Sequence, residues 1–326
     1  MGNLPRGRVS PGRPFLHTGV DYAGPINLRT TKGRGHRAYK GFIAVFVCLC
    51  TRAVHLEVAS DYSSEAFLAA FRRFTARRGL CMDMYSDCGT NFVGADRELR
   101  DLFRAASPDG RRIAHTTSSN GVRWHFNPPA APHFGSLWEA AVKSTKHHLR
   151  RVIGDSKLTY EELSTFLAQV EACLNSRPLQ ALTDDPEDFS ALTPGHFLIG
   201  APLLAVPEPA LTGTKENTLS RWQLLQKMRD HFWQRWSREY LHGLASRPKW
   251  LRTEAVPDIG CLCLIRSEIT PPTRWPLARI IKLHPGDDGV VRVVTLRTPT
   301  SELVRPLVKV VLLPGISNTP SHAENP

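Results

Sequence analysis

The sequence lacks most features of membrane, secreted or zinc-binding proteins. It has no Cys-x-x-Cys pair, and its seven cysteines are an odd number in 326 residues. With no signal peptide, this cysteine usage predicts a reducing compartment and argues against a structural zinc site. The continuous apolar stretch from Gly41 to Cys50 is too short to cross a bilayer. We therefore expect a soluble protein with no membrane partner.

Acidic residues are also scarce relative to basic ones. The chain has 42 Lys and Arg against 30 Asp and Glu, a net charge of +12. Two windows, residues 1–40 and 221–252, hold most of the excess, and the rest of the chain is close to neutral. Such concentrated charge indicates a polyanionic partner, and nucleic acid fits better than a membrane because no lipid-inserting segment accompanies it. The alternative is a merely soluble basic surface.

Strand-like and helix-like segments alternate in the first two thirds of the chain. Residues 42–50 are continuously apolar, which is typical of a central strand buried on both faces. Residues 54–58 alternate between apolar and polar, which predicts a half-buried antiparallel neighbour. The remaining elements are three short strands and three helices: strands at 17–22 (ending at Gly24-Pro25), 82–86 and 122–126, and helices from Ser63 or Ser64 to Arg78, at 136–153 and at 159–175.

The last third has a different composition. A Trp-rich helix running to about Leu241 is followed by four short β-like runs at 261–265, 278–283, 290–296 and 308–313, which predict a small β-barrel. The predicted organisation is a basic arm (1–14), an α/β core (15–200), a linker (201–220), a basic Trp-rich helical segment (221–252), the barrel (253–316) and a disordered tail (317–326).

Three carboxylates, Asp21, Asp87 and Glu139, each end a predicted strand or open a predicted helix. Acids placed in this way could meet at one edge of a sheet. Oxygen ligands of this kind suit Mg²⁺ or Mn²⁺. Two such ions can activate an attacking oxygen and stabilise a leaving oxygen in phosphoryl chemistry.

Glu139 shares one face of its predicted helix with three basic residues at i+4, i+7 and i+11: Lys143, Lys146 and Arg150. A metal ligand and phosphate-binding groups would then lie on the same face. Simpler explanations remain open. Glu139 and Lys143 could form a surface ion pair, and Asp21 and Asp87 could each serve a turn.

Two other clusters favour ordinary structural roles. The adjacent His147 and His148 would point in different directions on a helix, so we expect them to face solvent or DNA rather than to bind a metal. Trp222, Trp233 and Trp236 could stack on bases, but aromatic residues on a helix more often form a packed face, and packing is the preferred interpretation.

Several motifs, in this order, resemble the integrase core of LTR retrotransposons, specifically of the BEL/Pao type. They are residues 17–22, 86–92, 132–143, 174–179 and 192–200. Residues 222–250, 274–279 and 284–289 resemble the C-terminal region that follows this core. The resemblance covers roughly residues 13–315.

The resemblance implies a ribonuclease-H-like fold with a mixed five-stranded sheet flanked by helices, then a Trp-rich helical segment and a small SH3-like barrel. It implies a metal-dependent polynucleotidyl transferase in which Asp21, Asp87 and Glu139 hold two Mg²⁺ or Mn²⁺ ions. Such an enzyme trims element DNA ends, and the new 3′-hydroxyl then attacks target DNA. By the same resemblance, Lys143 and Lys146 match positions that hold the element's DNA end, and Asn91 matches a position near target DNA.

The resemblance also implies DNA as partner, a homo-oligomer and a nuclear location. Position 88, commonly Asn in the family's pattern, is Cys here. The family's N-terminal zinc-binding module is absent ahead of the core, so no zinc is expected and a fragment or a retained host gene is suggested. The alternatives are a catalytically lapsed or domesticated DNA-binding protein, and a protein that binds another protein through the Trp-rich helix and barrel.

Overall fold

The computed structural model divides the chain into two compact units. The first comprises Met1–Asn175 and Thr214–Phe232, and the second comprises Ser176–Gly213 and Trp233–Pro326. The structure describes these residues: 9–31, 35, 37–105, 121–126, 132–209, 211, 214, 219–244, 257–266 and 270–315, with only the backbone described for 102–105 and 132–141. The predicted tail and residues 1–8 of the predicted arm lie outside these ranges, and the predicted domain boundaries stay a prediction.

A mixed sheet forms the centre of the first unit. Its strands have the order β3-β2-β1-β4-β5, and the two-residue strand β6 also pairs with β1. β1, β2 and β3 are antiparallel, whereas β4 is parallel to both β1 and β5. The predicted mixed α/β architecture is confirmed, with these strands: β1 (His17–Arg29), β2 (Ala38–Cys48), β3 (Val54–Ala59), β4 (Asp83–Ser86), β5 (Arg123–Phe126) and β6 (Leu158–Thr159).

Helix α2 (Ser64–Arg78) covers one face of this sheet. It begins where the sequence predicts, because the Ser63 hydroxyl accepts a hydrogen bond from the Ala66 backbone N–H at 3.1 Å. Its Phe74 ring stacks on Phe46 of β2 with 4.3 Å between centroids, and both rings are fully buried. Burial of large aromatic rings makes this helix–sheet interface strongly stabilising.

Helix α6 (Tyr160–Asn175) protects the edge strand β3. The Asn175 side chain accepts a hydrogen bond from the Val54 N–H (2.8 Å) and donates one to the Val54 carbonyl (2.7 Å). The Glu171 carboxylate accepts another from the Leu56 N–H (3.0 Å). These bonds satisfy backbone groups that an open sheet edge would offer to another strand.

The strand β3 is buried on both faces, so the prediction of a half-buried strand is wrong. Its polar side chains His55 and Glu57 lie in buried ion pairs. His55 is 3.0 Å from Glu171 and 3.2 Å from Glu57, and Glu57 is 2.6 Å from Arg73. Their outside partners come from α2 and α6, which compensates the cost of burying charge. The alternation of apolar and polar residues at 54–58 shows which side chains are polar, but it does not show whether those side chains are exposed.

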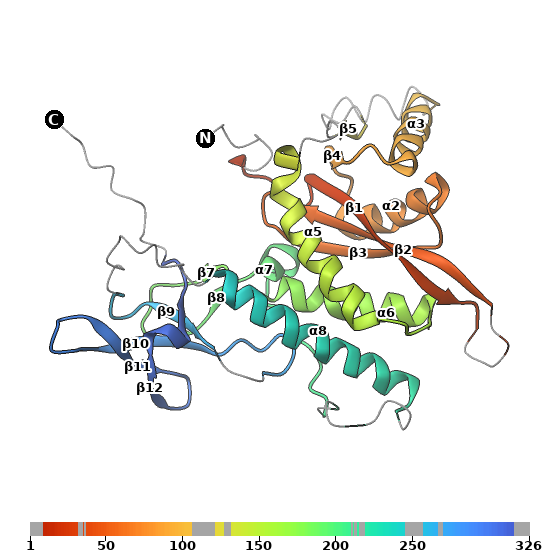
Figure 1. The fold of residues 1–326 in the computed structure, drawn as a ribbon. Coiled ribbons are helices and arrows are strands. Elements are labelled where there is room, and N and C mark those ends of the chain that lie inside the picture. Colours follow the sequence, from red (N-terminus) through yellow and green to blue (C-terminus); the bar gives the residue numbers. More distant parts are fainter. Residues whose placement is uncertain are drawn as a thin grey trace, which may run out of the picture. The chain divides into compact units, whose positions relative to one another are not determined.

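The opposite face of the sheet carries α5 (Pro132–Ile153), which contacts β1 and β2 (Figure 1). Neighbouring residues of a strand point to opposite faces. Because Phe46 faces α2, its neighbour Val45 and the Val45 partner on β1, Asp21, face α5.

The strand β1 is longer than predicted. The sequence predicted an end at Gly24-Pro25, but β1 continues to Arg29. Its pairing with β2 shifts in register between Ala23 and Ile26. A bulge therefore accommodates the two strand-breaking residues without ending the strand. The helix α3 (Thr90–Ala105) follows β4, and its Phe92 ring lies against Tyr22 of β1 with 5.3 Å between centroids.

The second unit is built on an antiparallel sheet with the strand order β12-β11-β10-β9-β13. The sequence predicted four of these strands and missed β12, which is short and mostly exposed. The elements of this unit are β7 (Gln180–Ala181), β8 (Ala191–Leu192), α7 (Pro194–Ile199), β9 (Leu262–Ile265), β10 (Leu277–Pro285), β11 (Val291–Arg297), β12 (Glu302–Pro306), η2 (Leu307–Lys309) and β13 (Val310–Leu312).

Residues from the first to the last strand of this sheet enclose one apolar core. Leu303 of β12 and Val310 of β13, the two outer strands, pack in the same cluster as Cys263 of β9. Leu264, the next residue of β9, points to the other face and packs with Leu241. Both faces of the sheet therefore bury apolar side chains.

Helix α8 (Arg221–Leu244) is the predicted Trp-rich helix, and it contributes residues to both units. Trp233 and Trp236 are buried, as the packing interpretation predicted, whereas Trp222 is exposed. Of the helices in the described ranges, none combines the length and apolar composition needed to cross a membrane.

Candidate active site

Asp21 lies near the middle of β1, on the face that carries α5. Its side chain is 28% exposed. Oδ1 accepts a hydrogen bond from the Tyr22 backbone N–H, and Oδ2 accepts one from the Lys146 ammonium, both at 2.6 Å. Burial raises the pKa of Asp21 and the Asp87 carboxylate adds to this, while Lys146 opposes it; the net shift is upward.

Asp87 directly follows β4, the parallel neighbour of β1. The register pairs Gly19 with Tyr85, and two residues further along both strands it brings Asp87 level with Asp21. Neighbouring strands are about 4.8 Å apart, which agrees with the effect of the Asp87 charge on the pKa of Asp21. The structure therefore brings two of the three predicted acids together, although 65 residues separate them in the sequence.

The loop after β4 packs closely around Gly89. The Gly89 N–H donates a hydrogen bond to Asp87 Oδ1 at 3.0 Å. A Cβ atom at this position would lie 2.7 Å from Asn91 Oδ1, and 3.1 Å from Asp87 Oδ1 and from the Tyr62 hydroxyl. Only glycine allows this approach without displacement. Tyr62 was not predicted as a site residue, and nothing in its sequence context signals its position.

Asn91, at the start of α3, is only 2% exposed. It lies close to the Tyr22 hydroxyl, yet within the described part of the chain neither the Asn91 amide nor that hydroxyl forms a hydrogen bond of normal geometry. Burial raises the pKa of Tyr22, which keeps its hydroxyl protonated. Because buried polar groups are normally hydrogen-bonded, these two groups offer a place for ordered water or a polar ligand next to Asp87.

Helix α5 presents its basic face above Asp21. Lys143 and Arg150 are exposed, and Lys146 between them reaches the aspartate. The backbone places Glu139 on the same face of α5, two turns before Lys146 and about 10 Å along the axis. The Glu139 side chain is not among those described, so its ion pair with Lys143 and its meeting with the aspartates stay predictions.

The two adjacent histidines of α5 have different surroundings. His147 is exposed, but His148 is 5% exposed and its ring lies edge-on to Phe232, with 6.1 Å between centroids. The prediction that both face solvent or DNA is therefore wrong for His148. Its side of α5 is covered by α8.

Asp21 and Asp87 fit the oxygen donor set of a hard divalent cation. Each is a carboxylate, and a cation between them would relieve the repulsion that contributes to the raised pKa of Asp21. In the structure, the Lys146 ammonium supplies positive charge beside Asp21 Oδ2. The described side chains contain no group of three His, Cys, Asp or Glu that could hold a metal. The third predicted ligand, Glu139, is outside that set.

Comparison with known proteins gives a family match and a set of structural similarities. Residues 220–313 match a family model described as "Family of unknown function (DUF5641)". A search of curated proteins finds no match. The chain is similar to a protein in the simian T-cell lymphotropic virus intasome in complex with PP2A regulatory subunit B56 gamma, with a TM-score of 0.37 and 11% identity, covering 96% of this chain and 84% of that chain.

The second similar structure is the HTLV-2 integrase catalytic core domain in complex with magnesium, in a trimeric form. The TM-score is 0.33 and the identity 14%, over 57% of this chain and 97% of that chain.

Proposed function

We propose that this chain is a DDE-type, metal-dependent polynucleotidyl transferase of BEL/Pao retrotransposon origin, which trims DNA ends and joins them to target DNA. The observation that carries the proposal is the placement of Asp21 and Asp87 side by side on the parallel strands β1 and β4. The helix that bears Glu139 covers the same face. The strand order, with three antiparallel strands followed by two parallel ones, fits a ribonuclease-H-like core.

The three acids would act together at phosphorus. Two Mg²⁺ or Mn²⁺ ions held by Asp21, Asp87 and Glu139 would activate the attacking oxygen and stabilise the leaving oxygen. Lys143 and Arg150, exposed on α5, are placed to bind backbone phosphates of the DNA end. Both reaction steps are in-line displacements that depend on positioning and charge stabilisation, without a covalent enzyme intermediate.

Lys146 has two roles in this proposal. In the structure its ammonium holds Asp21 Oδ2 and balances the charge of the two aspartates. Once a divalent cation takes that place, the ammonium is free to bind a DNA phosphate, as the resemblance implies for this position. Asn91, buried beside Asp87, would orient a water molecule or a polar group of the substrate.

The second unit supports a nucleic-acid function in a different way. Its strand order, with η2 between the two outer strands and one core shared by all five strands, fits an SH3-like barrel.

The proposal also includes element ends and target DNA as partners, a homo-oligomer and a nuclear location.

The alternative function is a domesticated or catalytically lapsed DNA-binding protein. One observation favours it: Cys88 stands beside Asp87, where the family's pattern commonly has Asn, and it is exposed. An exposed thiol beside a proposed catalytic acid is open to oxidation, which would add negative charge next to the metal ligands. In this case the basic faces would still bind DNA while the acids no longer support chemistry.

Splicing of a branched DNA that mimics the integration product separates the two functions, because this reversal of joining needs little beyond the core. The wild type is compared with Asp21→Asn and with the control Asp155→Asn, an exposed aspartate of the same unit. Splicing with Mg²⁺ or Mn²⁺ by the wild type and the control, but not by Asp21→Asn, supports the transferase. Salt-sensitive DNA binding without splicing by any variant would instead support the alternative.

A further inference from the structure

Two adjoining hollows on the second unit form a groove to which none of the functions above assigns a ligand. Their volumes are about 530 Å³ and about 880 Å³, within the range of sites that bind small molecules or single residues of a polymer. Both hollows are lined by Ile265, Arg266, Trp275 and Pro276. We call them together the Trp275 groove.

The Trp275 groove is strongly basic. Arg266 lies where the two hollows meet, Arg238 and Lys309 line the first, and Arg305 lines the second. No described lining residue is acidic. The Arg266 Nε atom is buried without a hydrogen-bond partner in the described ranges. Unpaired cations facing a shared hollow attract an anionic ligand.

Two other arginines of this unit lie in ion pairs. Arg292 lies 2.6 Å from Asp288, and Arg297 lies 2.6 Å from Glu187. Among the residues described, no such ion pair joins any of the four cations of the groove. Within the described ranges, the four groove cations thus differ from Arg292 and Arg297, whose charge is balanced by a neighbouring carboxylate.

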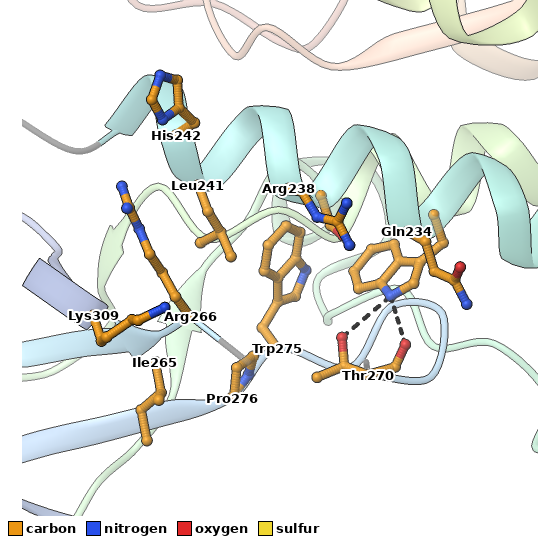
Figure 2. Close-up of a pocket in the computed structure, with 12 residues that line it drawn as sticks. Gln234, Arg238, Leu241, His242, Ile265, Arg266, Thr270, Trp275, Pro276 and Lys309 are labelled. Atoms are coloured by element: carbon orange, nitrogen blue, oxygen red, sulfur yellow. Dashed lines mark hydrogen bonds between the residues drawn. The ribbon is translucent and has the colours of Figure 1, made fainter. Parts of the chain in front are cut away.

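An aromatic ring lies at the centre of these charges. Figure 2 shows Trp275 with Arg238 on one side and Arg266 and Lys309 on the other. The ring is held in place by the Trp275 Nε1 hydrogen bond to Ser176 Oγ (3.1 Å) and by the Trp233 ring, which meets it at 70° with 4.8 Å between centroids. A fixed, half-buried indole can stack on a base at little entropic cost.

Hydroxyl groups complete the lining. In the first hollow they belong to Ser237 and Thr270, and in the second to Thr298, Thr300 and Ser301. Arginine, lysine and hydroxyl groups together are the usual donors to phosphodiester oxygens. The groove thus combines phosphate donors with a stacking surface, and these are the two components of single-strand recognition.

From these observations we propose that the Trp275 groove binds a short stretch of single-stranded nucleic acid, with one base against Trp275 and the phosphates on the surrounding cations. A duplex keeps its bases stacked inside and cannot offer one to Trp275 without opening. An acidic peptide would use the cations but not the aromatic surface. Single-stranded DNA and RNA share the required chemistry, and the groove does not depend on Asp21 or the chemistry proposed there.

The test measures binding of the full chain to a fluorescent oligodeoxythymidylate of about 12 nucleotides. The groove variant combines Arg238→Gln with Lys309→Gln. Its matched control combines Arg235→Gln with Lys282→Gln, which removes the same charge from the same helix and from the same unit at exposed positions outside the groove. Each contact to a single-strand phosphate adds about 0.7 to the salt slope. The groove variant should therefore lose about 1.4 of that slope, and the control none.

The same numbers give a simple readout. Between 50 and 200 mM salt, the groove variant should lose about sevenfold less affinity than the wild type, because two phosphate contacts are missing. Trp275→Leu should weaken single-strand binding at least about fivefold through lost stacking. Thermal melting shows whether each variant is folded. If Trp275→Leu unfolds, the two charge variants still decide the question.

Three further ligands test the class of partner. RNA of the same length shows which kind of single strand is preferred, and either preference supports the proposal. Because duplex DNA is also a proposed partner of the full chain, the duplex is compared between the variants. A groove variant that loses as much duplex affinity as single-strand affinity would overturn the proposal, and so would polyglutamate that displaces the oligonucleotide equally well. Equal effects of the groove variant and the matched control would also overturn it. Failure of the catalytic proposal would be seen separately, because the splicing assay measures strand joining and not binding of the oligonucleotide.

Discussion

Replacing Lys146 with glutamine should lower the stability of the folded protein and increase its affinity for divalent cations. The Lys146 ammonium lies 2.6 Å from Asp21 Oδ2, with the two side chains 32% and 28% exposed. Because both are partly in solvent, the pair is worth more than a surface ion pair and less than a buried one, about 1 kcal/mol. Lys146→Gln should lower the free energy of unfolding by about that amount without metal, measured by urea denaturation.

The same pair opposes metal binding, because a cation that binds Asp21 Oδ2 must displace the ammonium. Without the competing ammonium, the free energy of Mn²⁺ binding should become about 1 kcal/mol more favourable. This corresponds to a roughly fivefold lower dissociation constant. Isothermal titration calorimetry of the wild type and Lys146→Gln measures this change directly.

Lys143→Gln is the matched control. Lys143 is exposed on the same face of α5, one turn before Lys146, and its replacement removes the same charge. If the two variants bound Mn²⁺ equally well, general electrostatics would explain any gain, and the competition between Lys146 and the cation would be refuted. An unchanged dissociation constant in Lys146→Gln would refute it as well.

Three other predictions concern the first unit. Phe74→Ala should cost about 3–5 kcal/mol of unfolding free energy in urea, because Phe74 is fully buried and stacked on Phe46. Burial lowers the pKa of His55, but its hydrogen bonds to two glutamates prevail and raise it. The stabilising contribution of His55 is therefore complete below about pH 6.5 and is lost as the pH rises through its folded pKa, so the stability difference between wild type and His55→Gln should shrink as the pH rises above about 6.5. Gly89→Ala places a Cβ 2.7 Å from Asn91 Oδ1 and should reduce splicing up to about a hundredfold while the melting temperature changes little.

Local patterns in the sequence predicted the elements that depend on local physics. The α2 start follows from the Ser63 cap, and its burial follows from the helical spacing of Phe67, Phe71 and Phe74. The burial of β2 follows from a continuous apolar run. Each of these features is determined by residues that lie close together in the sequence.

Features that depend on distant partners were missed. The full burial of β3 depends on Glu171 and Arg73, which neutralise His55 and Glu57 from two different helices. The continuation of β1 past Gly24-Pro25 depends on a bulge that β2 supports. Both compensations come from tertiary pairing, which a single stretch of sequence does not contain.

The candidate site likewise has some features that the sequence predicted and others that it did not. The sequence predicted Asp21 and Asp87 as neighbours because each lies at a strand-like run, and the parallel register of β1 and β4 brings them level. The hydrogen bond from Lys146 to Asp21, across 125 residues, and the closeness of Tyr62 to Gly89 depend on side-chain geometry. Those contacts have no local sequence signal.

The proposed metal site for DNA splicing consists of Glu139 together with Asp21 and Asp87. Its most direct test is Glu139→Cys, assayed on the branched DNA with Mg²⁺ alone and with added Cd²⁺, because a thiolate binds a soft ion far better than Mg²⁺. The proposed site requires no splicing by Glu139→Cys with Mg²⁺, recovery with Cd²⁺, and no recovery in Glu139→Gln. Splicing by Glu139→Gln with Mg²⁺ at the wild-type rate would contradict it.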